Sequence, residues 1–364
     1  MTDSKPTMPL LVSGLLWSGS SAVVDALSQS DNVVALSGEF KFFSHWVAPR
    51  YAVLSILHNE IGSSEAFYQA AYDLMSLRMR VSRLPGGYYR KKLRGIRRIA
   101  AIVALPFLGP GAIRRVVNGL GMRTPVGSAE MLSSHLAQRT SRRLRQEARW
   151  HRFTVDGFWA TASEAAERLL AQIAHGRRYI VCDQAVPVLA RDLPHESPDG
   201  LAFYKDSVQF VVYRDPADQL SDFMVKGGRP QWERVFASRI ANYEGTETER
   251  FCKWQIDSLE LLHDLARRNP GRVIPVRFED FVTRYATWRT NIASMIDLDL
   301  PAGGGTGFDP GRSVKNIGIH KDILAADQRA SIDRLRPRFE QLWQNLDLAG
   351  RASIAAGNRV GEPD

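Results

Sequence analysis

Glycine and hydroxyl-bearing residues follow an apolar run near the start of the chain, in the order Gly14-Leu-Leu-Trp17-Ser18-Gly19-Ser20-Ser21. Against the phosphate-loop pattern G-x-x-x-x-G-K-[ST], both glycines have the right spacing and Ser21 takes the hydroxyl position. Ser20, however, stands where nucleotide-hydrolysing enzymes carry lysine. Backbone N–H groups at a helix N-terminus bind anions without that lysine. The segment predicts an anion-binding loop rather than Mg-NTP hydrolysis; a plain strand-turn-helix connection is the alternative.

A carboxylate follows the next apolar run, in Ser37-Gly38-Glu39-Phe40-Lys41-Phe42-Phe43. Ligands of doubly wound sheets bind outside the carboxyl ends of the strands, so we expect Glu39 to face the same crevice as the loop. There Glu39 could act as a general base beside apolar neighbours, and Lys41 could neutralise ligand charge. The alternative is a surface Glu-Lys pair beside aromatic residues that cap the core.

An arginine ends a third apolar run, in Val208-Gln-Phe-Val-Val-Tyr-Arg214-Asp215-Pro216. Pro216 is typical of a first helical turn, so Arg214 should lie between a strand and a helix. A guanidinium there can bind phosphate through two hydrogen bonds, and the Ser221 hydroxyl could add a second contact. The alternative is a simple ion pair between Arg214 and Asp215.

Two further groups of polar residues carry weaker predictions. Asp183 ends the run Tyr179–Asp183 and could orient an acceptor hydroxyl, although a helix N-cap explains it equally well. His45, His58 and His320 lack metal-ligand or triad spacing, so we predict structural roles for them, with His45 as a second candidate base. We expect no metal site.

The elements that must position these side chains alternate between strands and helices. Continuous apolar runs predict core strands at residues 9–13, 32–36, 179–183, 208–213 and 273–277. Such runs are typical of a parallel sheet covered on both faces. We therefore predict an α/β fold, with a P-loop-like parallel β-sheet flanked by helices and a large helical insertion at residues 60–150 that forms an acceptor lid or a membrane-surface element. The prediction is one domain over residues 1–350 and a flexible tail at 351–364.

Residues 82–123 combine many arginines and lysines with an apolar run that is too short to span a bilayer. One interpretation is a core helix with solvated basic flanks. The other is a basic amphipathic segment, at residues 88–117, that rests on an anionic membrane surface.

Composition limits the partners and the compartment. The 364-residue chain has a net charge of +9 and an apolar content of 44%, which indicates a globular protein that favours polyanionic partners. Cys182 and Cys252 show neither a disulfide nor a zinc pattern, and the N-terminus has no signal-peptide profile. We expect a cytoplasmic protein, located peripherally at the inner membrane face under the second interpretation above. Its oligomeric state is left open.

Taken together, these segments resemble the sulfotransferases that use 3′-phosphoadenosine-5′-phosphosulfate (PAPS), and more narrowly a bacterial-like variant of the heparan and carbohydrate type. Gly14 to Ser21 looks like the family's loop for the 5′-phosphosulfate, and Arg214 with Ser221 looks like its 3′-phosphate site. Glu39 lies 25 positions after Gly14, where these enzymes carry a catalytic glutamate in a similar Glu-x-x-Phe-Phe context.

Two later segments extend the resemblance. Val276-Arg-Phe-Glu279-Asp280 is similar to a family segment whose acidic residues hold structure. The stretch from residue 311 to 321 looks like the late basic loop that closes on the 3′-phosphate and adenosine, with an ordinary polar loop as the alternative. The residues that the resemblance assigns to this loop are Arg312, Lys315, Gly318 and Lys321.

The chain departs from the family pattern at two positions. Trp17 occupies the place of a lysine or arginine that contacts the bridging oxygen, so Lys41, Lys321 or a basic residue of the insertion would supply that charge. Ser221 comes one position earlier than usual, which rotates it by about 100° around its helix, so Gln219 or Lys226 could share its role.

The resemblance implies sulfuryl transfer from PAPS to a hydroxyl of a carbohydrate or lipid-linked glycan, with PAP (adenosine 3′,5′-bisphosphate) as the product and no metal. In this scheme Glu39 is the base, and Ser18 to Ser21 cradle the leaving phosphate. Two alternatives stay open: a P-loop-type kinase, and a non-catalytic protein that binds nucleotide or membrane through its basic surface. Nucleic acid is not an expected partner.

Overall fold

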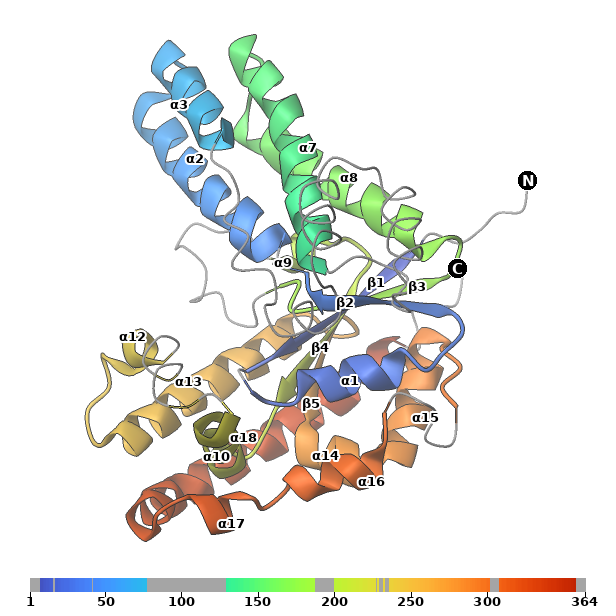
Figure 1. The fold of residues 1–364 in the computed structure, drawn as a ribbon, viewed down its shortest axis with the longest axis vertical. Helices are drawn as coiled ribbons and strands as arrows, with labels where there is room; N and C mark the ends of the chain where they lie inside the picture. Colours follow the sequence, from blue (N-terminus) through green and yellow to red (C-terminus); the bar gives the residue numbers. More distant parts are fainter. Residues whose placement is uncertain are drawn as a thin grey trace, which may run out of the picture. The chain divides into compact units, whose positions relative to one another are not determined.

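The computed structural model describes residues 7–15, 17–40, 42–76, 129–186, 200–226, 228, 232, 236–301 and 308–357. Its centre is a five-stranded sheet in the order β2-β3-β1-β4-β5 (Figure 1). The strands are β1 (Met8–Gly14), β2 (Val33–Glu39), β3 (Tyr179–Asp183), β4 (Val208–Tyr213) and β5 (Val273–Arg277). Helices flank the sheet, which confirms the predicted α/β class.

The apolar runs form strands because both of their faces are covered. Every residue of β4 is buried, and so are Leu10, Leu11 and Val12 of β1. β2 pairs with β3 and β4 pairs with β5, both in parallel. All five predicted strands are present. β2, however, continues to Glu39, so this residue ends the strand instead of following it.

The chain divides into two compact units. Unit 1 comprises Met1–Leu11 with Val33–Ser207, and unit 2 comprises Val12–Asn32 with Val208–Asp364. β1 contributes to both: the Met8 amide donates to the Arg178 carbonyl in unit 1, and the Leu15 amide donates to the Val212 carbonyl in unit 2. The expectation of one domain over residues 1–350 stays a prediction.

Unit 1 carries the helices that follow β2 in the chain. These are the π-helix η1 (Phe43–Val47), α2 (Ala48–Ile61), α3 (Glu65–Ser76), α7 (Ala129–Arg149), α8 (Val155–Ala174) and α9 (Gly200–Phe203). α3 packs against α2 and α7, while α7 and α8 also contact β2. The expected role of residues 60–150 as an acceptor lid stays a prediction, and the basic segment 82–123 lies outside the described residues.

Unit 2 contains the remaining helices. They are α1 (Ser20–Leu27), α10 (Pro216–Lys226), α12 (Ala237–Ile240), α13 (Glu247–Arg268), α14 (Phe278–Thr283), α15 (Tyr285–Ile296), α16 (Pro310–Ser313), the 3-10 helix η4 (Val314–Asn316), α17 (His320–Ile323) and α18 (Ala326–Gly357). α13 begins at a capping box formed by Thr246 and Glu249, and it packs against α18.

The C-terminal helix differs from the prediction made for the end of the chain. α18 runs to Gly357, so residues 351–357 of the expected tail are helical. Ser353 is buried there, and a Cβ added at Gly357 would meet the Met295 side chain at 2.5 Å. This close packing against α15 explains why a stretch of small residues stays helical. In the part of the chain that the structure describes, no helix is long and apolar enough to cross a membrane.

Candidate functional site

The loop between β1 and α1 is shaped by its two glycines. A Cβ added at Gly14 would lie 2.4 Å from the Ser18 Oγ, so only glycine lets the loop fold back so closely. Gly19, the N-cap of α1, has φ = 87°, and a Cβ there would lie 2.5 Å from a ring carbon of Phe278. Gly14 is therefore required for close approach alone. Gly19 is required both for close approach and for its left-handed backbone.

Among the described residues of this loop, Ser18 has a buried hydroxyl that a ligand could satisfy. Ser18 is 1% exposed, and its Oγ has no hydrogen-bond partner among the described residues. A buried polar atom without a partner carries a desolvation cost that a bound group can remove. The hydroxyl lies just before α1, which begins at Ser20 without a side-chain cap. The N–H groups of a helix's first turn point out of its N-terminal end. The donors present at this turn suit a phosphate or sulfate oxygen.

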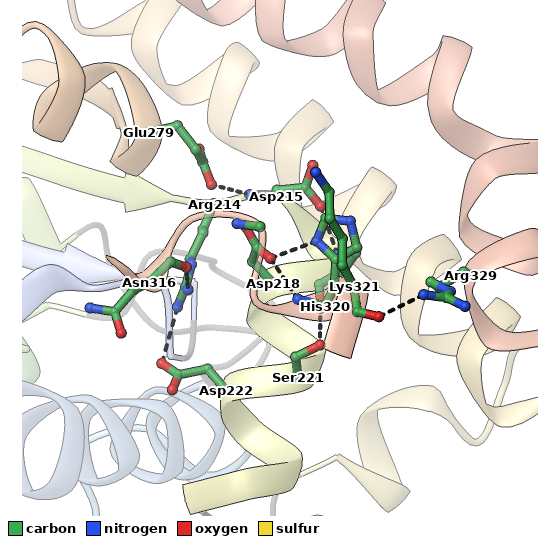
Figure 2. Close-up of polar contacts among 12 residues, drawn as sticks. Arg214, Asp215, Asp218, Ser221, Asp222, Glu279, Asn316, His320, Lys321 and Arg329 are labelled. Carbon is green, nitrogen blue, oxygen red and sulfur yellow. Dashed lines mark hydrogen bonds and ion pairs between the residues drawn. The ribbon is translucent and has the colours of Figure 1, made fainter. Parts of the chain in front are cut away.

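Arg214 lies beside this loop, because the Phe278 ring that contacts Gly19 also packs under its guanidinium at 5.0 Å. The Arg214 side chain is 2% exposed and forms an ion pair with the Asp222 Oδ2 at 3.0 Å. It also donates to the Asn316 carbonyl, while its Nε has no partner among the described residues (Figure 2). The structure thus brings Arg214 to the loop, but with its charge compensated by Asp222.

The alternative pairing of Arg214 with Asp215 is wrong. The Asp215 carboxylate instead accepts from Arg336 of α18 and from the Ala217 amide at 2.8 Å, and the Asp215 amide donates to Glu279 at 2.9 Å. Burial raises the pKa of the Glu279 carboxyl, and the hydrogen bond from the Asp215 amide opposes this rise. Glu279 therefore fixes the β4–α10 connection that carries Arg214, in line with the structural role expected for it.

The hydroxyl expected beside Arg214 faces inward. Ser221 is fully buried, and its Oγ donates to the Ala217 carbonyl at 2.8 Å. Gln219, named as a substitute, donates to the Leu15 carbonyl and accepts from Gln255 at 2.8 Å. Gln219 therefore ties α10 to the loop. The side chain of Lys226 lies outside the described residues.

The late basic stretch lies against α10 and α14. α17 packs against α10, and α16 and η4 pack against α14. The buried Asp218 carboxylate accepts from the Gly318 amide at 2.7 Å, and Gly318 has φ = 79°. Lys315 and Lys321 are exposed, as is Arg312, whose charge opposes the desolvation that raises the pKa of Asp25 on α1.

Trp17 brings no positive charge to the loop. Its backbone is left-handed, with φ = 55°, and its indole meets the Phe223 ring of α10 edge-on at 5.4 Å. Phe223 in turn packs against Trp232 and Phe236, so Trp17 extends an aromatic cluster. The resembled family carries a lysine or arginine at this position. In this chain the residue there, Trp17, serves packing.

In unit 1 the structure brings Glu39 and Asp183 together. They are register partners at the ends of β2 and β3, and the Phe40 amide donates to the Asp183 carbonyl at 2.8 Å. Residues 184–186 form a turn, so Asp183 does not cap a helix that starts directly after it. Lys41 lies outside the described residues, and so does the side chain of His45.

Two other expectations concern metals and histidines. The described residues contain no group of three or more His, Cys, Asp or Glu side chains that could hold a metal ion. The His58 ring packs edge-on against Phe67 at 5.5 Å, in line with the packing role expected for it.

Two acidic residues were not predicted as partners of Arg214 and of the late stretch. Asp218 and Asp222 lie one turn apart on the face of α10 that meets Arg214 and the late stretch (Figure 2). An Asp-x-x-x-Asp spacing after the arginine was a usable signal, since residues four apart share a helix face.

Comparison with known proteins adds a distant likeness. Neither the protein-family models nor the curated proteins match this chain. Among solved structures, the sulfotransferase domain of the olefin synthase from Synechococcus PCC 7002 is similar over 92% of this chain and 96% of that domain, with 13% identity and a TM-score of 0.41.

Proposed function

We propose that the chain is a PAPS-dependent sulfotransferase that transfers a sulfuryl group to a hydroxyl of a carbohydrate or lipid-linked glycan and releases PAP. The observation that carries the proposal is the buried, unpartnered Ser18 hydroxyl in a loop that abuts Arg214 through Phe278. The resemblance assigns these same residues to the 5′ and 3′ phosphates of the donor. A loop without the phosphate-loop lysine fits a donor that needs no Mg²⁺ better than it fits ATP.

The chain's own residues account for binding and proton transfer. PAPS supplies the sulfuryl group; its bond to the 5′-phosphate oxygen breaks as the acceptor oxygen bonds to sulfur. Negative charge on the leaving phosphate is stabilised by the Ser18 hydroxyl and by the N–H groups that open α1. Glu39 takes the acceptor proton as general base, and Asp183, its register partner, orients the acceptor hydroxyl.

We expect PAP to raise the melting temperature of the protein more than Mg-ATP does. A ligand that binds only the folded state stabilises it by about 2.7 kcal/mol at a concentration one hundred times its Kd. Thermal unfolding with each nucleotide at equal concentration measures the difference. A preference for Mg-ATP would favour the kinase alternative, and no response to either nucleotide would favour the non-catalytic one.

The Ser18→Ala variant tests whether PAP raises the melting temperature by binding at this loop. Removing an unpartnered buried hydroxyl should leave the free protein as stable as before or stabilise it by about 1 kcal/mol, while the shift caused by PAP shrinks. Ser258→Ala is the matched control, because the Ser258 Oγ is equally buried but donates to the Trp254 carbonyl at 2.7 Å. That control should lose stability and keep its response to PAP.

We expect Glu39→Gln to lower turnover by roughly 10²–10⁴-fold, the usual contribution of a general base, with PAP affinity unchanged. Sulfate transfer from radiolabelled PAPS to a panel of sugar and glycolipid acceptors is the assay. Asp183→Asn should act mainly on the KM for the acceptor. An active Glu39→Gln enzyme would remove Glu39 from the mechanism and direct attention to His45.

A further inference from the structure

Two buried glutamines link α13 to the loop between β1 and α1. The Gln255 Nε2 of α13 donates to the Gln219 Oε1 of α10 at 2.8 Å, and the Gln219 Nε2 donates to the Leu15 carbonyl. Gln255 is 3% exposed and Gln219 is 1% exposed. The two side-chain amides therefore form a relay, shielded from water, that begins on α13 and ends at the first residue after β1.

The direction of this amide relay is set at the loop. A backbone carbonyl only accepts hydrogen bonds, so Gln219 must turn its NH2 group toward Leu15 and its oxygen toward Gln255. The Gln219 oxygen in turn accepts from the Gln255 amide. A side chain without a donor at position 255 would take this hydrogen bond away from a buried oxygen, and the Gln219 amide could then no longer be held toward the loop in the same way.

A second series of contacts from the same place on α13 reaches another point of the loop. Trp254, the neighbour of Gln255, meets the Phe236 ring at 5.4 Å, Phe236 meets Phe223 at 4.9 Å, and Phe223 meets Trp17 at 5.4 Å. The loop is thus held by a hydrogen bond at its first residue and by ring packing at Trp17. Both points precede the Ser18 hydroxyl, which has no partner among the described residues.

We propose that Gln255 is a positioning residue for the 5′-phosphate of the donor, acting through Gln219 on the loop that carries Ser18. This inference rests on the proposed function, because it takes this loop to hold the 5′-phosphate. The relay acts at Leu15, whose amide donates to the Val212 carbonyl at 3.0 Å while its carbonyl accepts from Gln219. Both backbone groups of this residue are fixed before a ligand arrives, and a loop ordered in advance loses less entropy on binding.

The two roles that Gln255 could have differ in which part of the nucleotide loses affinity. PAP carries the 5′-phosphate, whereas adenosine 3′-monophosphate (3′-AMP) lacks it. A residue that only maintains the fold would, when replaced, weaken both ligands alike. A residue that orders the loop affects PAP alone, so the ratio of the two Kd values separates the roles.

Calorimetric titration of the full chain with PAP and with 3′-AMP tests the proposal. We expect Gln255→Met to weaken PAP binding about tenfold, equal to ~1.4 kcal/mol, and to change the Kd of 3′-AMP less than about twofold. Methionine has a similar length but no donor for the Gln219 oxygen. Gln255→Asn is the second variant: it keeps an amide, but is one methylene shorter and should give the same change in the ratio.

Two further variants separate positioning from stability. Ser258→Ala lies one turn further along α13 and removes the hydrogen bond to the Trp254 carbonyl at 2.7 Å, so it should lower stability and keep the ratio of the Kd values. Gln219→Met removes the donor to Leu15 and should weaken PAP binding at least as much as Gln255→Met does. Adding Gln255→Met to Gln219→Met should then cause no further loss of PAP affinity, since Gln255 acts through Gln219.

The outcomes distinguish the two proposals. Wild-type protein that does not bind PAP overturns the proposed function and this inference with it. Wild-type protein that binds PAP, beside a Gln255→Met variant whose affinities for PAP and 3′-AMP fall by the same factor or not at all, overturns this inference alone. A further loss of PAP affinity in the double variant would also contradict it, because the two glutamines would then act independently.

Discussion

Replacing Arg214 with alanine should lower the free energy of unfolding by about 3–5 kcal/mol and abolish PAP binding. The side chain is 2% exposed and its partner Asp222 is 12% exposed, so the variant removes the ion-pair partner of a buried carboxylate. The Asn316 carbonyl loses its donor in the same change, which loosens the late stretch. Urea unfolding and calorimetric titration with PAP measure the two losses.

Two further variants separate charge from folding. Arg214→Met combined with Asp222→Leu removes both charges and should recover most of the stability without recovering PAP binding. Arg351→Ala removes an exposed arginine that pairs with Asp347 at 2.7 Å and should change stability by less than about 0.5 kcal/mol. A double variant that still binds PAP would show that Arg214 is a structural residue only.

Gly19→Ala should lower stability and PAP binding about as much as Arg214→Ala does, because it strains the backbone and disturbs the packing of the loop. The left-handed conformation at φ = 87° costs a residue with a Cβ roughly 1–2 kcal/mol. The added carbon would also lie 2.5 Å from the Phe278 ring, so the loop or the ring must move. We expect a total loss of about 3 kcal/mol or more and no detectable PAP binding.

Gly176→Ala is the matched control for this change. Gly176 has a similar φ of 80°, but a Cβ there would meet nothing within 4 Å. It should lose only the backbone contribution and keep its affinity for PAP. Equal losses in the two variants would mean that Phe278 yields easily and that contact with it does not shape the loop.

The strands could be predicted because their burial is encoded locally. The runs 179–183, 208–213 and 273–277 became β3, β4 and β5 with unchanged bounds, since each is a short apolar segment between turns. β2 is longer than predicted because Ser37, Gly38 and Glu39 are poor strand formers on their own. The end of β2 depends on pairing across the sheet: Glu39 is the register partner of Asp183 in β3, after an irregularity between Ala35 and Glu39, and β3 follows more than 140 residues later.

The candidate site was predictable where one segment carries a pattern, and unpredictable where distant segments meet. The loop glycines and Arg214 are part of local motifs, and the structure brings them together. The role of Asp218 could not be predicted because its partner His320 lies 102 residues away in the sequence. From its spacing alone, His320 was predicted to have only a structural role. The inward hydrogen bond of Ser221 likewise depends on how α10 is turned against its neighbours.

The split of β1 between the two units has a consequence for the order of folding during synthesis. Residues 12–32, which carry the predicted anion-binding loop, belong with residues 208–364, and all of 33–207 is made in between. At translation rates of about 5–20 residues per second, the loop waits roughly 10–40 seconds for Arg214 and longer for Phe278. Unit 1 therefore has time to fold on the first half of β1 while the second half has no partner strand. The end of β1 that carries the loop therefore pairs with β4 only after the whole of unit 1 has been made.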